Sequence, residues 1–283
     1  MSWQILVGIS VLLFSLNGLF HRTIMRDIKS DPYTQTIIFY GLGGIFILLL
    51  SLLNGGVNLS FRAEQLPYIV LLTIFATSAP VLAFKSLKLI QASESSILLS
   101  SQRLWIVIGA FLFLREDFSY SKLFGVIIVI IGITIAQWKN KKFVINQGVI
   151  FALLAAVAYG LTEIISFYLL RDLDTITFTV LLSFLPVIAL LLIKPGCIKK
   201  LALYFRPKYA INITIVSVND AIATLFLFYA YQVGRNAAQI APIMATQTIL
   251  TVIFAIIILK ERENTVRNII GACIVVLGVL LVL

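Results

Sequence analysis

The sequence predicts an all-α polytopic membrane protein whose ten transmembrane helices form two inverted five-helix repeats. Its 283 residues are 60% hydrophobic and 12% charged, with a mean hydropathy of +1.05, whereas soluble domains carry about 25% charged residues. The apolar residues gather in runs of about 18–24, the length that crosses a hydrocarbon core. Short charged signals recur about 145 positions apart, with five runs in each half of the chain.

The charged signals define the repeat. Arg26-Asp27 ends the first apolar run and Arg171-Asp172 ends the sixth, while Leu114-Arg115-Glu116 ends the fourth and Leu259-Lys260-Glu261 ends the ninth. Because five is odd, the second copy should enter the membrane inverted, which is a frequent construction of secondary transporters. The predicted division is a first repeat at 1–138, a basic connector at 139–147 and a second repeat at 148–283.

Continuous apolar runs favour helices, because a lipid-exposed backbone must satisfy its own hydrogen bonds and a barrel strand would alternate polar with apolar residues. The ten helices are expected near 3–22, 33–54, 66–86, 92–114, 121–138, 146–170, 174–193, 209–232, 237–259 and 265–283.

The basic residues predict the orientation. Five of the 22 Lys and Arg fall on the side of both termini, sixteen fall on the opposite side, and Arg103 lies inside a span. Cytoplasmic loops carry an excess of Lys and Arg, so we expect a multi-pass protein of the plasma (cytoplasmic) membrane with both termini outside. This distribution also accounts for the net charge of +10 without a nucleic-acid partner. No cleavable signal peptide is expected, since no basic segment precedes the first run.

Several classes of site are not expected. Two distant cysteines, Cys197 and Cys273, and a single histidine offer no metal-ligand spacing. No paired-His motif, Ser/His/Asp arrangement or glycine-rich phosphate loop is present in the sequence. We therefore predict no enzyme activity, no metal and no cofactor.

The Leu-x-Glu endings are each followed by two glycines seven positions apart, Gly125 and Gly132 in the first half and Gly271 and Gly278 in the second. With Asp31-Pro32 and Gln91-Ala92-Ser93, this pattern resembles the two halves of an EamA-like, ten-helix member of the drug/metabolite transporter superfamily. The resemblance covers essentially the whole chain and implies a membrane transporter.

One departure from the family pattern concerns the fourth helix of each unit, where the family usually has a proline. Those positions are Arg103 and Thr248 here. We therefore expect the substrate pocket of this chain to differ from those of its relatives.

Ionisable groups at membrane depth are costly and mark transport pathways or ion pairs by default. Arg103 shares a helix face with Ser93, Ser96 and Ser100 and is predicted either to bind an anion or to form a structural ion pair. Asp220 is a candidate proton or cation site, or alternatively the permanent partner of Arg103.

Further candidates come from polar side chains in the other runs. Glu163 could bind a proton or a substrate amine, or reach interfacial water. Asn17 and His21 share one helix face, and His21 is either a proton relay or a headgroup-level residue. The amides of Gln102 and Gln247 could hydrogen-bond a substrate or clamp helices together, and Tyr229 could stack on a cation.

Two structural expectations concern helices four and nine. Small residues at matching positions predict that these two helices pack against each other; the second-half set is Ala238, Ala241, Ala245 and Thr248. Glu116 and Glu261 are expected at helix ends, as caps or gate contacts.

These features predict a secondary active transporter that moves a small organic metabolite by alternating access, with a proton as candidate coupling ion. The alternative on the same fold is a flippase for a lipid-linked or amphipathic head group. The substrate, the direction of transport and the choice between monomer and homodimer are left open by the sequence.

Overall fold

The structure is a computed structural model that describes residues 2–27, 29–53, 56–58, 61–106, 120–139, 142–143, 145–234, 240, 243–261 and 265–282. The first half contains α1 (Trp3–Met25), α2 (Pro32–Leu53), the short η1 (Ala63–Gln65), α3 (Leu66–Leu89), α4 (Ala92–Leu99) and α6 (Tyr120–Gln137). The second half contains α7 (Gln147–Leu169), α8 (Thr175–Ile193), η2 (Pro195–Cys197), α9 (Ile198–Tyr204), α10 (Pro207–Gly234), α12 (Gln247–Ile258) and α13 (Thr265–Val282). Between them lies a two-residue antiparallel pair, β1 (Trp138–Lys139) and β2 (Lys142–Phe143).

The helices confirm a polytopic membrane protein. Six helical segments in the described part are long and apolar enough to span a bilayer, and three shorter apolar helices accompany them. Each of the ten predicted ranges overlaps a helix, although 92–114 and 237–259 lie partly outside the described residues. The number of membrane crossings therefore stays a prediction.

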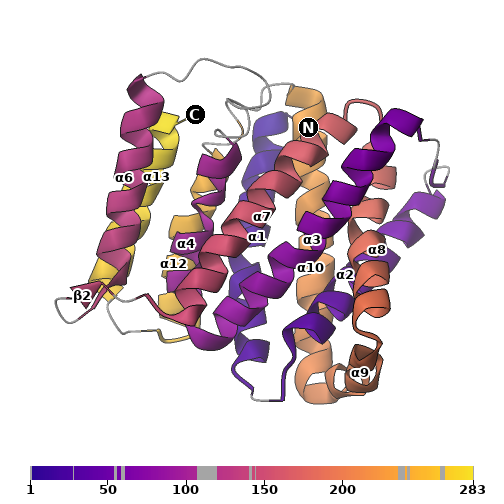
Figure 1. Ribbon diagram of the computed structural model, residues 1–283, viewed down its shortest axis with the longest axis horizontal. Helices are drawn as coiled ribbons and strands as arrows, with labels where there is room; N and C mark the ends of the chain where they lie inside the picture. The colour runs from indigo at the N-terminus through magenta and orange to yellow at the C-terminus, as the bar shows by residue number, and fades with distance from the viewer. Residues whose placement is uncertain are drawn as a thin grey trace.

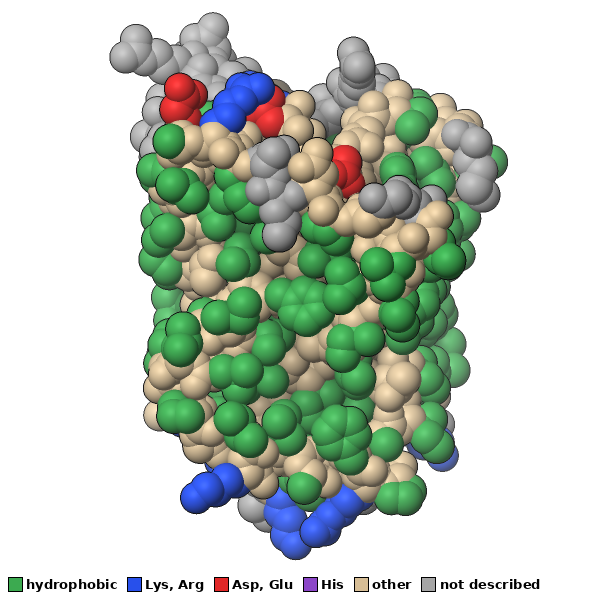
Figure 2. All heavy atoms as spheres, turned by 90° about the vertical axis from the view of Figure 1, so that its right-hand side faces the viewer, with side chains coloured by type: hydrophobic (Ala, Val, Ile, Leu, Met, Phe, Trp, Pro, Cys, Tyr) green, Lys and Arg blue, Asp and Glu red, His purple; other side chains and the backbone are tan. Residues whose placement is uncertain are grey.

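The surface suits lipid rather than water. Leu49, Leu53 and Leu192 are 58%, 83% and 78% exposed, and Figure 2 shows hydrophobic side chains covering the middle of one face. At one end of that face the charged side chains in view are all Lys or Arg, while the other end carries both signs of charge. The first of these is called the basic end below.

The two halves are interleaved rather than separate. The most extensive helix contacts all join a first-half helix to a second-half helix: α6 with α13, α3 with α7, α1 with α10, and α2 with α8. α4 packs against α12, which confirms the predicted contact between helices four and nine. Both ends of the chain lie at the same end of the bundle, opposite α9 (Figure 1).

The fourth helix of the first half is interrupted, which differs from the continuous helix predicted over 92–114. α4 ends at Leu99, a turn occupies Ser100 and Ser101, and the helix resumes at Gln102. The two serine hydroxyls donate to the carbonyl oxygens of Ile97 and Leu98, at 2.6 and 2.7 Å. Such side-chain bonds compete with the backbone ladder and bend helices.

The equivalent helix of the second half is interrupted in the same way. Thr246 is a turn residue between residues 243–245 and α12, and its hydroxyl donates to the carbonyl oxygen of Ile243 at 2.6 Å. Both interruptions are present although Arg103 and Thr248 stand where the family pattern usually has a proline. At each break a hydroxyl side chain bonds back to the preceding turn.

α9 is attached to the basic end through Asp31, which lies just before α2. The Asp31 Oδ2 atom accepts hydrogen bonds from the Thr34 backbone N–H at 3.0 Å and the Thr34 hydroxyl at 2.8 Å, and Lys200 Nζ lies 3.1 Å from Oδ1. Burial raises the pKa of the Asp31 carboxyl, but these hydrogen bonds and the Lys200 charge outweigh burial and hold the pKa below its ordinary value. The Tyr204 hydroxyl also bonds the Asp31 backbone.

Glycines set the close approach of α6 and α13, which stand as a pair at one side of the bundle (Figure 1). A Cβ atom on Gly278 would lie 2.7 Å from the backbone N of Val129 and 2.8 Å from the carbonyl O of Gly125. A Cβ atom on Gly132 would lie 2.8 Å from the backbone N of Val275. Small residues allow membrane helices to pack this closely.

Gly278→Ala is therefore expected to destabilise the protein, because the added methyl group meets backbone atoms that cannot rotate away. Overpacking of this kind costs about 1–3 kcal/mol, which should lower the midpoint of thermal unfolding in detergent. Gly8→Ala in α1 is the matched control, since nothing lies within 4 Å of its added methyl group. Equal midpoints for the two variants would contradict the packing argument.

Candidate functional site

A cavity of about 320 Å³ lies between the two halves. Its lining residues come from α1, α2, α3 and the interrupted fourth helix of the first half, and from α7, α8, α10 and α12 of the second. Among the described residues, α6 and α13 contribute none of the lining. The cavity is therefore formed jointly by the two halves.

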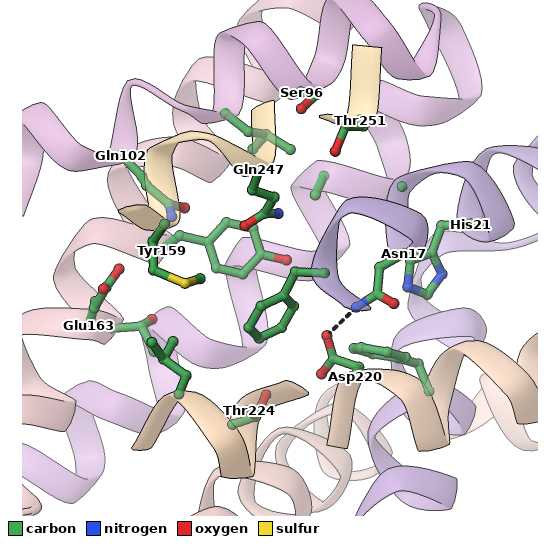
Figure 3. A pocket seen from close by; sticks show the side chains of 18 of the residues that line it. Asn17, His21, Ser96, Gln102, Tyr159, Glu163, Asp220, Thr224, Gln247 and Thr251 are labelled. Carbon is green, nitrogen blue, oxygen red and sulfur yellow. Dashed lines mark hydrogen bonds between the residues drawn. The ribbon is translucent and has the colours of Figure 1, made fainter. Parts of the chain in front are cut away.

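Seven of the eight sequence candidates line this cavity: Asn17, His21, Gln102, Arg103, Glu163, Asp220 and Gln247. Figure 3 shows Asn17, His21 and Asp220 on one side of the view and Glu163 and Gln102 on the other. The eighth candidate, Tyr229, is 38% exposed and is not among the lining residues. Its neighbour Tyr231 instead donates to the Glu163 carboxylate at 3.3 Å.

Arg103 pairs with Glu163. The Arg103 Nη1 atom lies 2.6 Å from Glu163 Oε1, and the two side chains are only 6% and 17% exposed. The structure differs from the alternative in which Asp220 is the partner of Arg103, because Glu163 takes that place. The pair is possible because α7 comes close at Gly160, where a Cβ atom would lie 2.9 Å from the carbonyl O of Gln102.

Asp220 is held by a chain of side-chain amides that joins α10 to α1. Asn219 Nδ2 donates to the Leu13 carbonyl at 2.7 Å and to Asn17 Oδ1 at 2.6 Å. Asn17 Nδ2 then donates to Asp220 Oδ1 at 2.7 Å. Because the Asn17 oxygen is occupied by Asn219, its NH₂ group is the end that points to Asp220.

His21 lies inside the bundle. It is 5% exposed, and its ring contacts those of Phe39 and Phe84 at centroid distances of 4.8 and 4.4 Å. Its Nδ1 atom lies 2.7 Å from Gln35 Nε2. His21 therefore faces the protein interior, while its depth in the bilayer stays a prediction.

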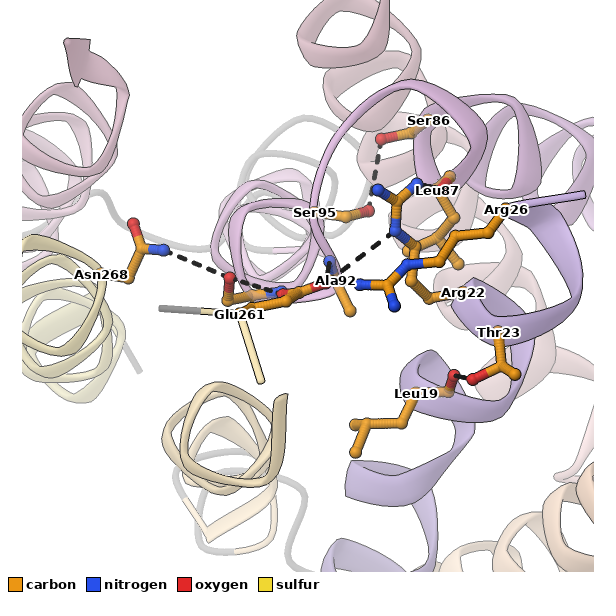
Figure 4. Close-up of polar contacts among 11 residues, drawn as sticks. Leu19, Arg22, Thr23, Arg26, Ser86, Leu87, Ala92, Ser95, Glu261 and Asn268 are labelled. Atoms are coloured by element: carbon orange, nitrogen blue, oxygen red, sulfur yellow. Dashed lines mark hydrogen bonds and ion pairs between the residues drawn. The ribbon is translucent and has the colours of Figure 1, made fainter. Parts of the chain in front are cut away.

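Glu261 makes the densest polar contact at the basic end (Figure 4). The residue is only 4% exposed. Its carboxylate accepts hydrogen bonds from the backbone N–H groups of Ala92 and Ser93 at 3.0 and 3.1 Å, and from the Ser93 hydroxyl at 3.0 Å. Arg26 Nη2 and Arg22 Nε lie 3.4 and 3.9 Å from its Oε1 atom. Glu261 thus caps α4 of the other half, at the favourable positive end of that helix.

The contacts of Glu261 connect three elements: α1, the start of α4 and the connection between α12 and α13. We refer to Glu261, Arg22, Arg26, Ala92 and Ser93 as the Glu261 cluster. The chain turns into it at Lys260, whose φ of 54° is the left-handed conformation. The prediction of a cap is confirmed for Glu261, while Glu116 lies outside the described residues.

A comparison with protein-family models decides the family. The model of the EamA-like transporter family matches residues 1–137 and again residues 146–283. The chain belongs to the EamA-like transporter family. Its described structure agrees with that assignment, because it is a helical bundle with long apolar helices around a cavity that charged and polar side chains partly line.

Similar proteins also carry the name of transporter. An uncharacterized transporter of Clostridium kluyveri is 22% identical over 97% of this chain and 90% of its own length. An uncharacterized transporter of Methanothermobacter thermautotrophicus is 28% identical over 48% of this chain, and the match spans 39% of that relative. One crystal structure superposes on this chain with a TM-score of 0.68 at 16% sequence identity. The superposition covers 99% of this chain and 95% of the other protein, which shows a shared fold.

Sequence reasoning missed parts of the site in this EamA-like transporter. Tyr40 lines the cavity, but nothing in the sequence distinguishes it from aromatics that pack against lipid. Arg22 and Arg26 were expected only to mark the orientation and, for Arg26, the repeat. Their spacing of four residues at a helix end was the available sign that both could reach one anion.

Proposed function

We propose that this membrane transporter is a secondary active carrier that moves a small organic metabolite by alternating access between two inverted five-helix repeats. The observation that carries the proposal is the cavity, because it lies between the halves and three charged side chains, Arg103, Glu163 and Asp220, line it. Proteins bind small organic ligands in such cavities, with a few polar groups that fix their orientation.

Three observations support the inverted repeat. The same family model matches both halves of the chain. The two halves also make reciprocal helix contacts. The first helix of the first half, α1, packs on α10, and the first helix of the second half, α7, packs on α3. Interruptions occur at equivalent places, Ser100–Ser101 and Thr246, and interrupted helices at the midplane are a common feature of carriers with inverted repeats.

The Glu261 cluster supports a gate at the basic end. Its carboxylate joins α1 to α4 and to the α12–α13 connection, so opening the cavity at this end would require these contacts to separate. A ligand can favour one facing state only by binding it better than the other. We propose that Asp220 and Glu163 are the groups through which a proton or a charged substrate biases the two states, in a plasma membrane protein with both termini outside.

Ligand-induced stabilisation followed by counterflow tests the function. Purified protein is screened for thermal stabilisation by amino acids, nucleosides, sugars and amines, because a ligand at 100 times its Kd stabilises the native state by about 2.7 kcal/mol. A stabilising compound should then show saturable counterflow in proteoliposomes, which protein-free liposomes lack. Head-group transfer between leaflets without any soluble counterflow would favour the flippase and contradict the proposal.

A further inference from the structure

The charges on the cavity wall do not balance. Among the described lining residues, Arg103 is the one guanidinium and no lysine is present, whereas both Glu163 and Asp220 are carboxylates. Glu163 already neutralises Arg103 at 2.6 Å. No ion pair joins Asp220 to a basic side chain in the described part of the chain, so its carboxylate is the group that lacks a cation.

The position of the Asp220 carboxylate is fixed in advance of any ligand. Asn219 orients Asn17, and Asn17 holds Oδ1 at 2.7 Å. The second oxygen, Oδ2, has no protein donor among the described residues, and Asp220 itself lines the cavity (Figure 3). A preorganised acceptor of this kind binds a ligand at a lower entropic cost than a mobile one.

Six Phe and Tyr side chains line the same cavity as this carboxylate. The aromatic lining residues are Phe14, Phe39, Tyr40, Phe84, Tyr159 and Phe228. Aromatic rings attract organic cations through their faces as well as covering apolar groups. One carboxylate without a basic partner and six aromatic rings in the same cavity therefore favour a cationic ligand with an apolar body.

We propose that the substrate is a small organic ammonium ion and that Asp220 Oδ2 binds its cationic nitrogen. This inference rests on the proposed carrier function and adds the chemical class of the cargo. It assigns Asn17 and Asn219 as positioning residues for the carboxylate. Glu163, which pairs with Arg103, lies on the opposite side of the view from Asp220 (Figure 3), and this pairing leaves Asp220 as the attractive charge.

The test uses the intact purified chain and three probes of similar size that differ in charge: benzyltrimethylammonium, benzyl alcohol and benzenesulfonate. The ammonium probe should raise the thermal stability of the protein, and the neutral and anionic probes should not. Asp220→Asn keeps the acceptor for Asn17 but removes the charge, and should weaken the apparent affinity for the ammonium probe by roughly tenfold or more, because the Coulomb attraction between carboxylate and cation is lost. Asp220→Glu keeps the charge and should retain the preference for the cation.

Asp174→Asn is the matched control. Asp174 lies outside the cavity and accepts a hydrogen bond from Thr177 N at 2.9 Å as the N-cap of α8, a role that asparagine also fills. This variant should bind the ammonium probe as the unmodified protein does.

The inference would be overturned if only the neutral or the anionic probe stabilised the protein, or if none of the three did. It would also be overturned if the ammonium probe stabilised Asp220→Asn as much as the unmodified protein. The proposed function has its own readout. If a compound from the wider screen shows counterflow that depends on Asp220 while ammonium ions neither stabilise the protein nor compete, Asp220 is a proton site. The carrier assignment would then stand and the cationic cargo would not.

Discussion

Arg103→Leu is expected to abolish transport and to lower the free energy of unfolding by about 3–5 kcal/mol, the usual cost of removing one member of a buried ion pair. The reason is that Glu163, only 17% exposed, would be left buried without the guanidinium that lies 2.6 Å away. Chemical or thermal unfolding of the purified variant measures the loss, and counterflow of the stabilising compound measures transport. Glu163→Leu should show a similar loss, because it leaves Arg103 without its anion.

The double variant Arg103→Leu/Glu163→Leu separates a structural role from a functional one. Removing both charges leaves no uncompensated ion, so most of the lost stability should return. Transport should not return, since Glu163, one of the two carboxylates proposed to bias the two facing states, would be absent and only Asp220 of the two would remain in the cavity. Transport at the unmodified rate in the double variant would show that the pair serves only to hold α7 against the fourth helix.

A second ion pair gives a matched control for this experiment. Arg62 Nη2 lies 3.7 Å from Asp172 Oδ1, but the two side chains are 71% and 38% exposed. Exposed pairs contribute little to stability because water and salt screen them. Arg62→Leu is therefore expected to leave both unfolding and transport near their unmodified values.

Glu261→Gln is the second change with a large expected effect. Glutamine keeps one acceptor oxygen and places an NH₂ group against donors, so at least one N–H or O–H of Ala92 or Ser93 loses its partner. Leaving a buried donor unsatisfied costs about 1–3 kcal/mol, and Arg22 and Arg26 lose their anion as well. The contacts between α1, α4 and the α12–α13 connection should therefore separate more readily.

Cysteine accessibility measures that separation. Ser96 lines the cavity, so Ser96→Cys in a chain lacking Cys197 and Cys273 reports entry of a membrane-impermeant maleimide from the basic end. Labelling should be faster with Glu261→Gln than without it. Asp31→Asn removes another carboxylate of the basic end, one that binds Thr34 and Lys200 rather than α4, and should not change the rate. Equal labelling in all three proteins would contradict a gate at the Glu261 cluster.

Much of the site could be predicted because membrane depth makes polar residues conspicuous. Asn17, Arg103, Glu163 and Asp220 interrupt long apolar runs, and each such interruption is costly enough to require a reason. All four line the cavity. Tyr229 could not be judged in this way, since a tyrosine is equally at home on a lipid-facing surface and 38% of this one is exposed.

The choice of partners was not predictable from the sequence. Arg103 had two carboxylates within possible reach, and the pairing with Glu163 depends on the close approach of α7 at Gly160. The interruption before Arg103 was also missed, because serine and threonine within a helix are usually compatible with it. Only the positions of the Ile97 and Leu98 carbonyls show that the hydroxyls bond to them.

The sequence by itself determined that the chain is a membrane-embedded helical transporter of the EamA-like family, because the length of apolar runs and the recurrence of short signals are properties of the linear chain. The tertiary structure decided which charges neutralise each other and which carboxylate is left to face the cavity. It also placed Glu261 at the start of α4, a helix of the other half. The physical reason is that an ion pair or a cap depends on distances of a few ångströms between helices, and those distances follow from how small residues such as Gly160 let two helices approach.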